Sequence, residues 1–166
     1  MHFLKAAVLC LLPLVSVASP VARAPTDLHS QIQKPESGTV IAPGQAFDFQ
    51  YRGVADYSVS SYNYSVWLFT EKPNGFVSGD DIGAGELLGR FDYQNYPGVP
   101  YATHPAPAQL VMPDFSRYYS GFGGGQSASN APVYLAVIEE YKQGSSFGFR
   151  LHLTYNELIY NGTTTN

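Results

Sequence analysis

Two pairs of adjacent carboxylates are the first side chains in this sequence that could do chemistry: Asp80–Asp81 and Glu139–Glu140. Hydrolysis of a glycosidic bond needs two carboxyl groups at a fixed separation, one of them with a raised pKa. Neighbours in a strand point to opposite faces of the sheet, so Glu139 and Glu140 cannot share a site from one strand. Asp80 and Asp81 lie among glycines and could offer oxygen ligands to calcium, or simply form a solvated loop.

The histidines form no recognisable metal motif. His29, His104 and His152 are widely spaced, whereas copper and zinc sites need clustered ligands. Residues 144–148 approach the Gly-x-Ser-x-Gly motif of serine hydrolases without matching it. We therefore expect no cofactor and no resident metal, and no catalytic residue can be assigned.

Tyrosine is the residue type that stands out, with 13 Tyr beside 10 Phe. A tyrosine ring buries apolar area while keeping a polar tip, which suits recognition surfaces and the faces of sugars. We expect a binding patch around the glycine-rich stretch at residues 121–125, formed by Tyr96, Tyr101, Tyr118, Tyr119 and Phe122. The alternative is that these rings only cap the open ends of the fold.

Composition and charge exclude several classes of protein. Aromatic residues make up 14% of the chain, and disordered chains are poor in them. Charged residues make up only 13%, about half of the usual ~25%. The formal net charge is −4, so a nucleic-acid partner is not expected, because such proteins carry a basic patch.

The first residues have the layout of a secretory signal peptide. Lys5 precedes an apolar run from Ala6 to Val17, and small residues end it at Ser16-Val17-Ala18. The run is too short to cross a bilayer, which takes about 20 residues. We expect cleavage after Ala18, which would remove Cys10, the only cysteine. The mature protein is then extracellular, with a flexible leader at residues 19–30, a folded domain at 31–160 and a tail at 161–166.

Two Asn-x-Ser/Thr acceptors fit a secreted chain. They begin at Asn63 and Asn161, and glycosylation at either would place that asparagine side chain in solvent. We expect a glycoprotein on this basis.

Alternation with a period of two residues dominates the rest of the sequence. Gln45–Arg52 places Phe and Tyr on one face, Val59–Glu71 is rich in Tyr, Val and Phe, and Val133–Ile138 is an apolar run. In Phe147–Tyr155, apolar residues alternate with polar ones. No window shows a helical period, so we expect an all-β fold, an antiparallel Ig-like β-sandwich of about seven strands.

Two expectations concern which side chains face the core. Trp67, the only tryptophan, could be a platform for stacking sugars, but the interpretation we favour is a core tryptophan of the sandwich. His152 lies on the polar face of its predicted strand, where we expect it to be exposed.

Several stretches resemble a known family. They are residues 32–44, 47–51, 65–70 and 133–139. They are similar to small secreted proteins of mushroom-forming fungi with no assigned activity, over most of residues 31–160. The Pro-x-x-Gly opening is more distantly similar to the Ig-like N-terminal domain of fungal Ser/Thr-rich anchored and β-1,6-glucan assembly cell-wall proteins. The resemblance implies an extracellular sandwich near the cell wall and supplies no catalytic residue.

Taken together, the sequence favours a secreted, monomeric, non-catalytic protein that binds a polysaccharide or an extracellular protein and has no membrane span. Two alternatives stay open. One is a hydrolase or metal-dependent enzyme whose site is assembled from dispersed residues. The other is a structural or effector-like protein that binds a protein partner and no glycan.

The predicted tyrosine patch is tested by removing two of its rings. We expect Tyr118→Ala and Tyr119→Ala to weaken binding to polysaccharide, because each deletes an apolar face for stacking. A glycan array and a polysaccharide pull-down measure this. If both variants bind polysaccharide as the wild type does, the rings form no binding site, and the interpretation that they cap the open ends of the fold is favoured.

Overall fold

The computed structural model describes residues 30–56, 59–76, 78–79, 81–94, 99–117, 121–122, 127–143 and 149–162. The predicted signal peptide, the predicted leader apart from Ser30, and residues 163–166 lie outside this part of the chain.

The described residues form strands and no helix. The ten strands are β1 (Gln31–Lys34), β2 (Val40–Ile41), β3 (Ala46–Asp48), β4 (Gln50–Arg52), β5 (Ala55–Asp56), β6 (Val59–Phe69), β7 (Gly85–Asp92), β8 (Gln109–Val111), β9 (Ser129–Gln143) and β10 (Phe149–Asn161). In this part of the chain, accordingly, no helix is long and apolar enough to cross a bilayer.

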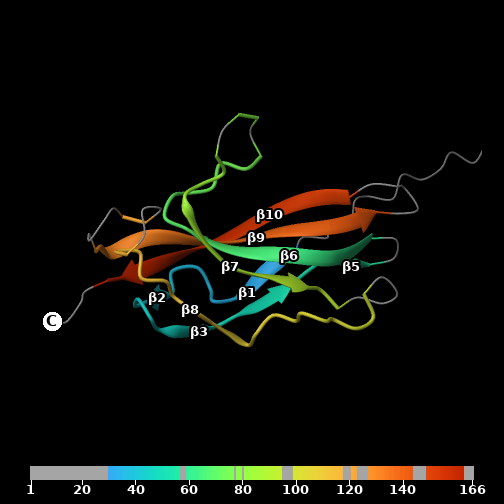
Figure 1. The fold of residues 1–166 in the computed structure, drawn as a ribbon, viewed down its shortest axis with the longest axis horizontal. Coiled ribbons are helices and arrows are strands. Elements are labelled where there is room, and N and C mark those ends of the chain that lie inside the picture. The colour runs from blue at the N-terminus through green and yellow to red at the C-terminus, as the bar shows by residue number, and fades with distance from the viewer. Residues whose placement is uncertain are drawn as a thin grey trace, which may run out of the picture.

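A six-stranded sheet forms one layer of the sandwich. Its strand order is β2-β10-β9-β6-β5, and β7 also pairs with β6. Two small pairs, β1 with β4 and β3 with β8, lie on the opposite side of the core (Figure 1). The predicted all-β sandwich is thus confirmed, although the described residues form ten strands rather than about seven, and two further features differ. The pairing of β2 with β10 is parallel, and the expected strand at Gln45–Arg52 divides at Phe49 into two strands with different partners.

The core lies between these layers. The large sheet contributes Val66 and Leu68 from β6 and Val133, Leu135 and Val137 from β9, all fully buried. The opposite layer contributes Ile32, Phe47, Phe49, Leu110 and Met112. Burying a side chain of this size contributes about 1.5–3 kcal/mol, so this contact between layers is the main source of stability.

The face that β10 turns toward the core differs from the sequence prediction. Leu158 and Tyr160 are fully buried, and side chains alternate along a strand, so His152 faces inward with them. His152 is half-buried, and its Nδ1 lies 2.7 Å from the hydroxyl of Ser30. Leu151 is on the other face and 55% exposed. The prediction that His152 is exposed is wrong. The C-terminal half of β10 supplies the core residues, and their burial decides which face of the whole strand is turned inward.

Trp67 also lies on the face turned away from the core. Its neighbours in β6, Val66 and Leu68, are the buried ones, and Trp67 is half-buried. The Trp67 ring stacks on Phe69 with 5.9 Å between centroids and 6° between planes. The interpretation of Trp67 as a core residue of the sandwich is therefore wrong.

Two leucines of the same strand test this assignment of faces. Leu158→Ala should lower the free energy of unfolding by about 2–5 kcal/mol, because it leaves a cavity in the core. Leu151→Ala, the matched control on the outward face, should cost less than about 1 kcal/mol. Urea unfolding measures both. A larger loss for Leu151→Ala than for Leu158→Ala would mean that β10 is turned the other way.

Candidate functional site: the outer face of the large sheet

The registers of β7, β6, β9 and β10 place outward side chains in four cross-strand rows, which we call the outer face. A polar row holds Asp92, Asn63, Glu140 and Leu151, and a mixed row holds Arg90, Ser65, Ile138 and Leu153. An aromatic row holds Leu87, Trp67, Ala136 and Tyr155, and an end row holds Gly85, Phe69, Tyr134 and Glu157. Strands lie about 4.8 Å apart and alternate residues about 6.7 Å apart, so the rows form one continuous surface.

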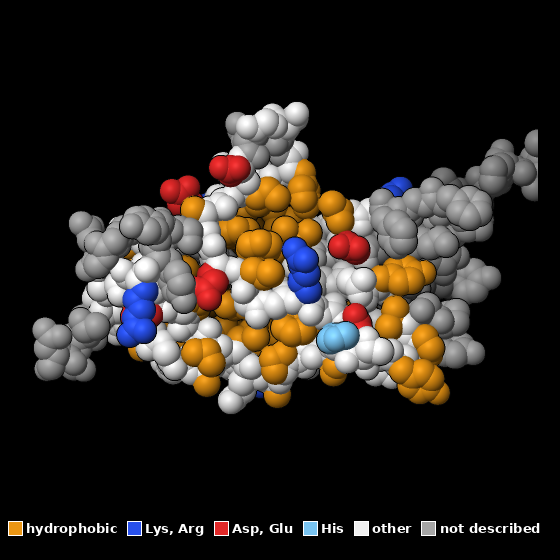
Figure 2. All heavy atoms as spheres, viewed as in Figure 1, with side chains coloured by type: hydrophobic (Ala, Val, Ile, Leu, Met, Phe, Trp, Pro, Cys, Tyr) orange, Lys and Arg blue, Asp and Glu red, His pale blue; other side chains and the backbone are white. Residues whose placement is uncertain are grey.

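The middle of the outer face is apolar. Leu87 is 38% exposed, and Trp67, Tyr134 and Tyr155 are each half-buried. Tyr134 and Tyr155 meet edge to face with 5.8 Å between centroids. Figure 2 shows hydrophobic side chains gathered in the centre of the view, with acidic and basic side chains around them. Apolar side chains that meet in this way on an uncovered face are typical of an interaction surface.

The position of Trp67 is fixed by its immediate neighbours. Its indole Nε1 donates a hydrogen bond to the hydroxyl of Ser65 at 3.0 Å. Phe69, which stacks on it, is buried, and the backbone at Gly83 lies so close that an added Cβ would be 3.2 Å from the Phe69 ring. Trp67 is therefore backed by a covered ring and can offer its own ring without rearrangement.

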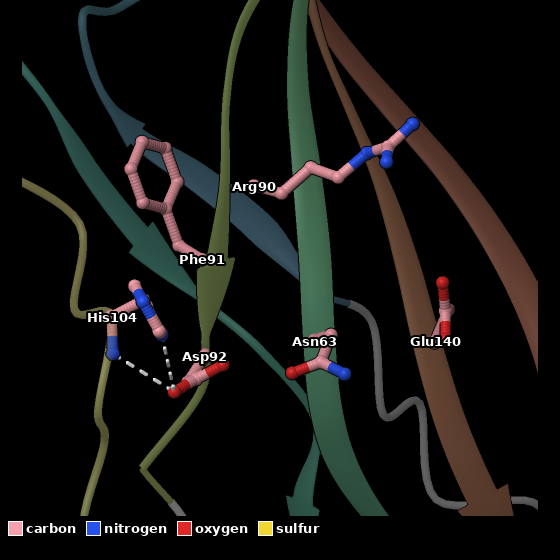
Figure 3. A pocket seen from close by; sticks show the side chains of 6 residues that line it. All are labelled: Asn63, Arg90, Phe91, Asp92, His104 and Glu140. Atoms are coloured by element: carbon pink, nitrogen blue, oxygen red, sulfur yellow. Dashed lines mark hydrogen bonds and ion pairs between the residues drawn. The ribbon is translucent and has the colours of Figure 1, made fainter.

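A shallow hollow of about 280 Å³ lies at the polar end of this face. It is lined by Asn63, Arg90, Phe91, Asp92, His104 and Glu140. Figure 3 shows Arg90 reaching from β7 across β6 toward β9, with Asn63 between β7 and Glu140. The hollow thus offers hydrogen-bond donors and acceptors beside the aromatic row.

Asp92 holds the segment at residues 103–104 against this hollow. One carboxylate oxygen accepts hydrogen bonds from the Thr103 hydroxyl at 2.7 Å, the Thr103 amide at 2.8 Å and the His104 amide at 2.9 Å. The Thr103 hydroxyl and these amides hold the pKa of Asp92 below its usual range, because each bond favours the charged form. Asp92 is therefore ionised and fixed in place at neutral pH.

Asn63 combines two roles in the polar row. Its side chain is exposed, as glycosylation requires. With its amide oriented to donate, Nδ2 reaches the Tyr62 carbonyl and the second Asp92 oxygen, both at 3.1 Å. Asn161, the other acceptor, lies half-buried at the end of β10 opposite Ser129. Glycosylation of both remains a prediction.

Glu139 and Glu140 lie on opposite faces of the sheet, as the period of β9 indicated. Glu140 is exposed on the outer face, whereas Glu139 is fully buried. An oxygen of Glu139 accepts hydrogen bonds from the Val54 amide at 3.0 Å and from the Ser61 hydroxyl. A Cβ added at Gly53 would lie 2.8 Å from that same oxygen. Glu139 therefore holds the chain at residues 53–54 against the sheet.

Tyrosine rings surround this buried carboxylate. Burial raises the pKa of Tyr51, and the nearby Glu139 carboxylate raises it further. Burial, with a smaller effect of Tyr93, raises the pKa of Tyr64 to about 12. Tyr51, Tyr64 and Tyr93 pack together with 4.8–6.3 Å between ring centroids. Tyr64 thus belongs to the core, and Tyr51 and Tyr93 pack against it.

The tyrosine patch expected from the sequence is only partly within the described residues. Tyr101 is 83% exposed. Phe122 packs against Phe115 and Tyr160, with 5.8 and 5.2 Å between centroids, next to the core. Tyr96, Tyr118 and Tyr119 lie outside the described part of the chain. That patch, including Tyr101 and Phe122, stays a prediction.

Of the other chemical candidates, His29 and residues 144–148 lie outside the described part of the chain. Asp80 lies outside the described residues and Asp81 is exposed. In the described ranges, no three His, Cys, Asp or Glu side chains are close enough to hold a metal ion.

Sequence reasoning missed the outer face. Its principal members are Trp67, Leu87, Arg90, Tyr134, Glu140 and Tyr155. One signal was present: Val133–Ile138 is apolar at every position rather than at alternate ones, which is typical of a strand covered on both faces. A sheet with two apolar faces offers a second surface on which contact with another molecule could bury apolar area.

Comparisons with known proteins give little. No family model matches the chain, and no curated protein does. A solved structure that matches is the "Cu(I) NMR solution structure of the chitin-active lytic polysaccharide monooxygenase BlLPMO10A", with a TM-score of 0.33 and 10% identity, over 75% of this chain and 58% of that one. The present chain thus corresponds to less than two thirds of that protein. At this TM-score the likeness assigns neither a family nor an activity.

The role of Asp92 can be tested through Thr103. Thr103→Val removes the hydroxyl donor and leaves the two amide donors, so the pKa of Asp92 should rise toward its ordinary value. Because the folded-state pKa is lowered, the stability that Asp92 contributes is present above about pH 3.9 and is lost as the pH falls through the folded pKa. Carboxyl-carbon NMR titration measures the shift. An unchanged pKa of Asp92 would mean that the Thr103 hydroxyl does not lower it.

Proposed function

We propose that this protein binds a neutral polysaccharide on its outer face, in the extracellular space or cell wall. The observation that carries the proposal is the half-buried aromatic row around Trp67, which lies on the outer face beside the polar hollow of Asn63, Arg90 and Glu140.

The two halves of this face match the two sides of a sugar ring. A pyranose has flat faces of C–H groups, which pack on aromatic rings, and a rim of hydroxyl groups, which need hydrogen bonds. Trp67 and Tyr155 supply rings in one row. Arg90 and Glu140, both exposed, supply a charged donor and a charged acceptor, which form stronger hydrogen bonds than neutral groups.

The balance of charge favours a neutral ligand over an acidic one. Arg90 lies beside Glu140 and Asp92 in the hollow, so the site as a whole is not basic. The net charge of the chain is −4, which repels a polyanion at low salt.

Ring-deleting variants test the proposal. Trp67→Ala should weaken binding at least about tenfold, because a tryptophan at the centre of an interface supplies much of its affinity. Tyr155→Ala should weaken binding less and Trp67→Phe least, since the latter keeps a ring. Pull-down with cellulose, chitin and insoluble β-glucan, and calorimetry with soluble oligosaccharides, measure this on protein made without N-glycans, so that a glycan at Asn63 cannot occupy the polar row.

Tyr101→Ala is the control that separates the two candidate sites. It removes the exposed ring of the tyrosine patch and should leave binding at the outer face unchanged. Melting temperatures identify variants that fail to fold. The proposal is overturned if no polysaccharide binds, or if Tyr101→Ala abolishes binding while folded Trp67→Ala does not.

A further inference from the structure

We propose that a second copy of this chain adds to the open edge of β10, so that the protein forms a two-fold dimer with one continuous sheet. This inference does not rest on the proposed function. It departs from the monomer that the sequence led us to expect, and it is carried by the backbone of β10.

The direction of each backbone group in β10 follows from its contacts with residues 38–40. The Ile159 amide donates to the Thr39 carbonyl at 2.9 Å, and the Glu157 carbonyl accepts from the Gly38 amide at 2.8 Å. Alternate residues of a strand direct their N–H and C=O groups to the same side. Leu151, Leu153 and Tyr155 therefore direct theirs to this side too, away from β9.

Within the described ranges, no strand pairs with that side of β10 along most of its length. β2 pairs with β10 only at Ile159 and Tyr160, whereas β9 pairs along the whole of the other side. Among the described residues, none makes a hydrogen bond to the edge-facing backbone groups of Leu151, Leu153 and Tyr155. Figure 1 shows β10 at the border of the sheet.

In the described part of the chain, the middle of this edge carries few of the features that usually prevent strand addition. Proteins protect long edges with proline, lysine, bulges or a covering segment. Residues 150–156 contain neither proline nor lysine, and their pairing with β9 is regular, the only register shift falling between Tyr160 and Asn161. Leu151 is 55% exposed directly at this edge.

Self-complementarity favours a second copy as the occupant. Antiparallel pairing about Leu153 sets exposed Arg150 opposite Asn156, so no like charges meet across the two-fold axis, whereas in-register parallel pairing would set Arg150 beside Arg150 and Glu157 beside Glu157. A two-fold axis through Leu153 places Leu151 opposite Tyr155 of the second copy. Such an interface closes on itself, and it joins the two apolar outer faces side by side.

A proline at position 151 tests the dimer directly. Leu151→Pro removes an N–H that points to the open edge and takes part in no hydrogen bond with β9, so the fold should persist. Leu151→Ala is the matched control, because it loses the same side chain and keeps the N–H. Sedimentation equilibrium of the full mature chain at physiological salt gives the dimer dissociation constant of each.

The wild type should dimerise, and Leu151→Pro should raise the dissociation constant at least about tenfold beyond Leu151→Ala, because two hydrogen bonds are lost per dimer. Circular dichroism confirms folding. Leu153→Lys, which places like charges opposite each other across the two-fold axis, replaces the proline variant if that variant unfolds. A wild type that stays monomeric, or a dimer that folded Leu151→Pro and Leu153→Lys leave unchanged, overturns the proposal, whether or not polysaccharide binds.

Discussion

The register in which β9 pairs with β6 and β10 is the constraint on which the rest of the structure depends. A shift of one residue in a sheet moves every side chain to the opposite face. Val133, Leu135 and Val137 are fully buried on the inner face of β9, and moving them into water would cost several kcal/mol. That burial fixes the register, and the register then decides what the other face presents.

The pairing of β9 with its two neighbours also explains why the two faces of the sheet differ in role. On the inner face, β9 continues from apolar residues to Glu139, whose buried carboxylate holds the chain at residues 53–54. On the outer face, the strand carries Tyr134 and Ile138, and its Ala136 lies between Trp67 of β6 and Tyr155 of β10. A single central strand thus anchors the second layer on one side and builds an apolar surface on the other, while β10 leaves its own edge open.

Sequence alone predicted the fold class and the places of the long strands β6, β9 and β10, because period-two alternation and apolar runs are local signals. It did not predict the faces. In Phe147–Tyr155 the regular alternation suggested that the apolar side is buried, yet Leu158 and Tyr160, further along the strand, fix the opposite side. Trp67 was misassigned for the same reason, since its side follows from Val66 and Leu68. Which apolar face is buried depends on where the second layer packs, and this cannot be predicted from the pattern of residues within one strand.

The most direct test of the account measures the solvent exposure of Trp67, the only tryptophan, by acrylamide quenching of its fluorescence. An indole on the outer face should be quenched readily in the mature protein, and a bound polysaccharide should reduce the quenching. A blue-shifted emission that acrylamide does not quench would place Trp67 in the core and contradict the existence of an outward aromatic face.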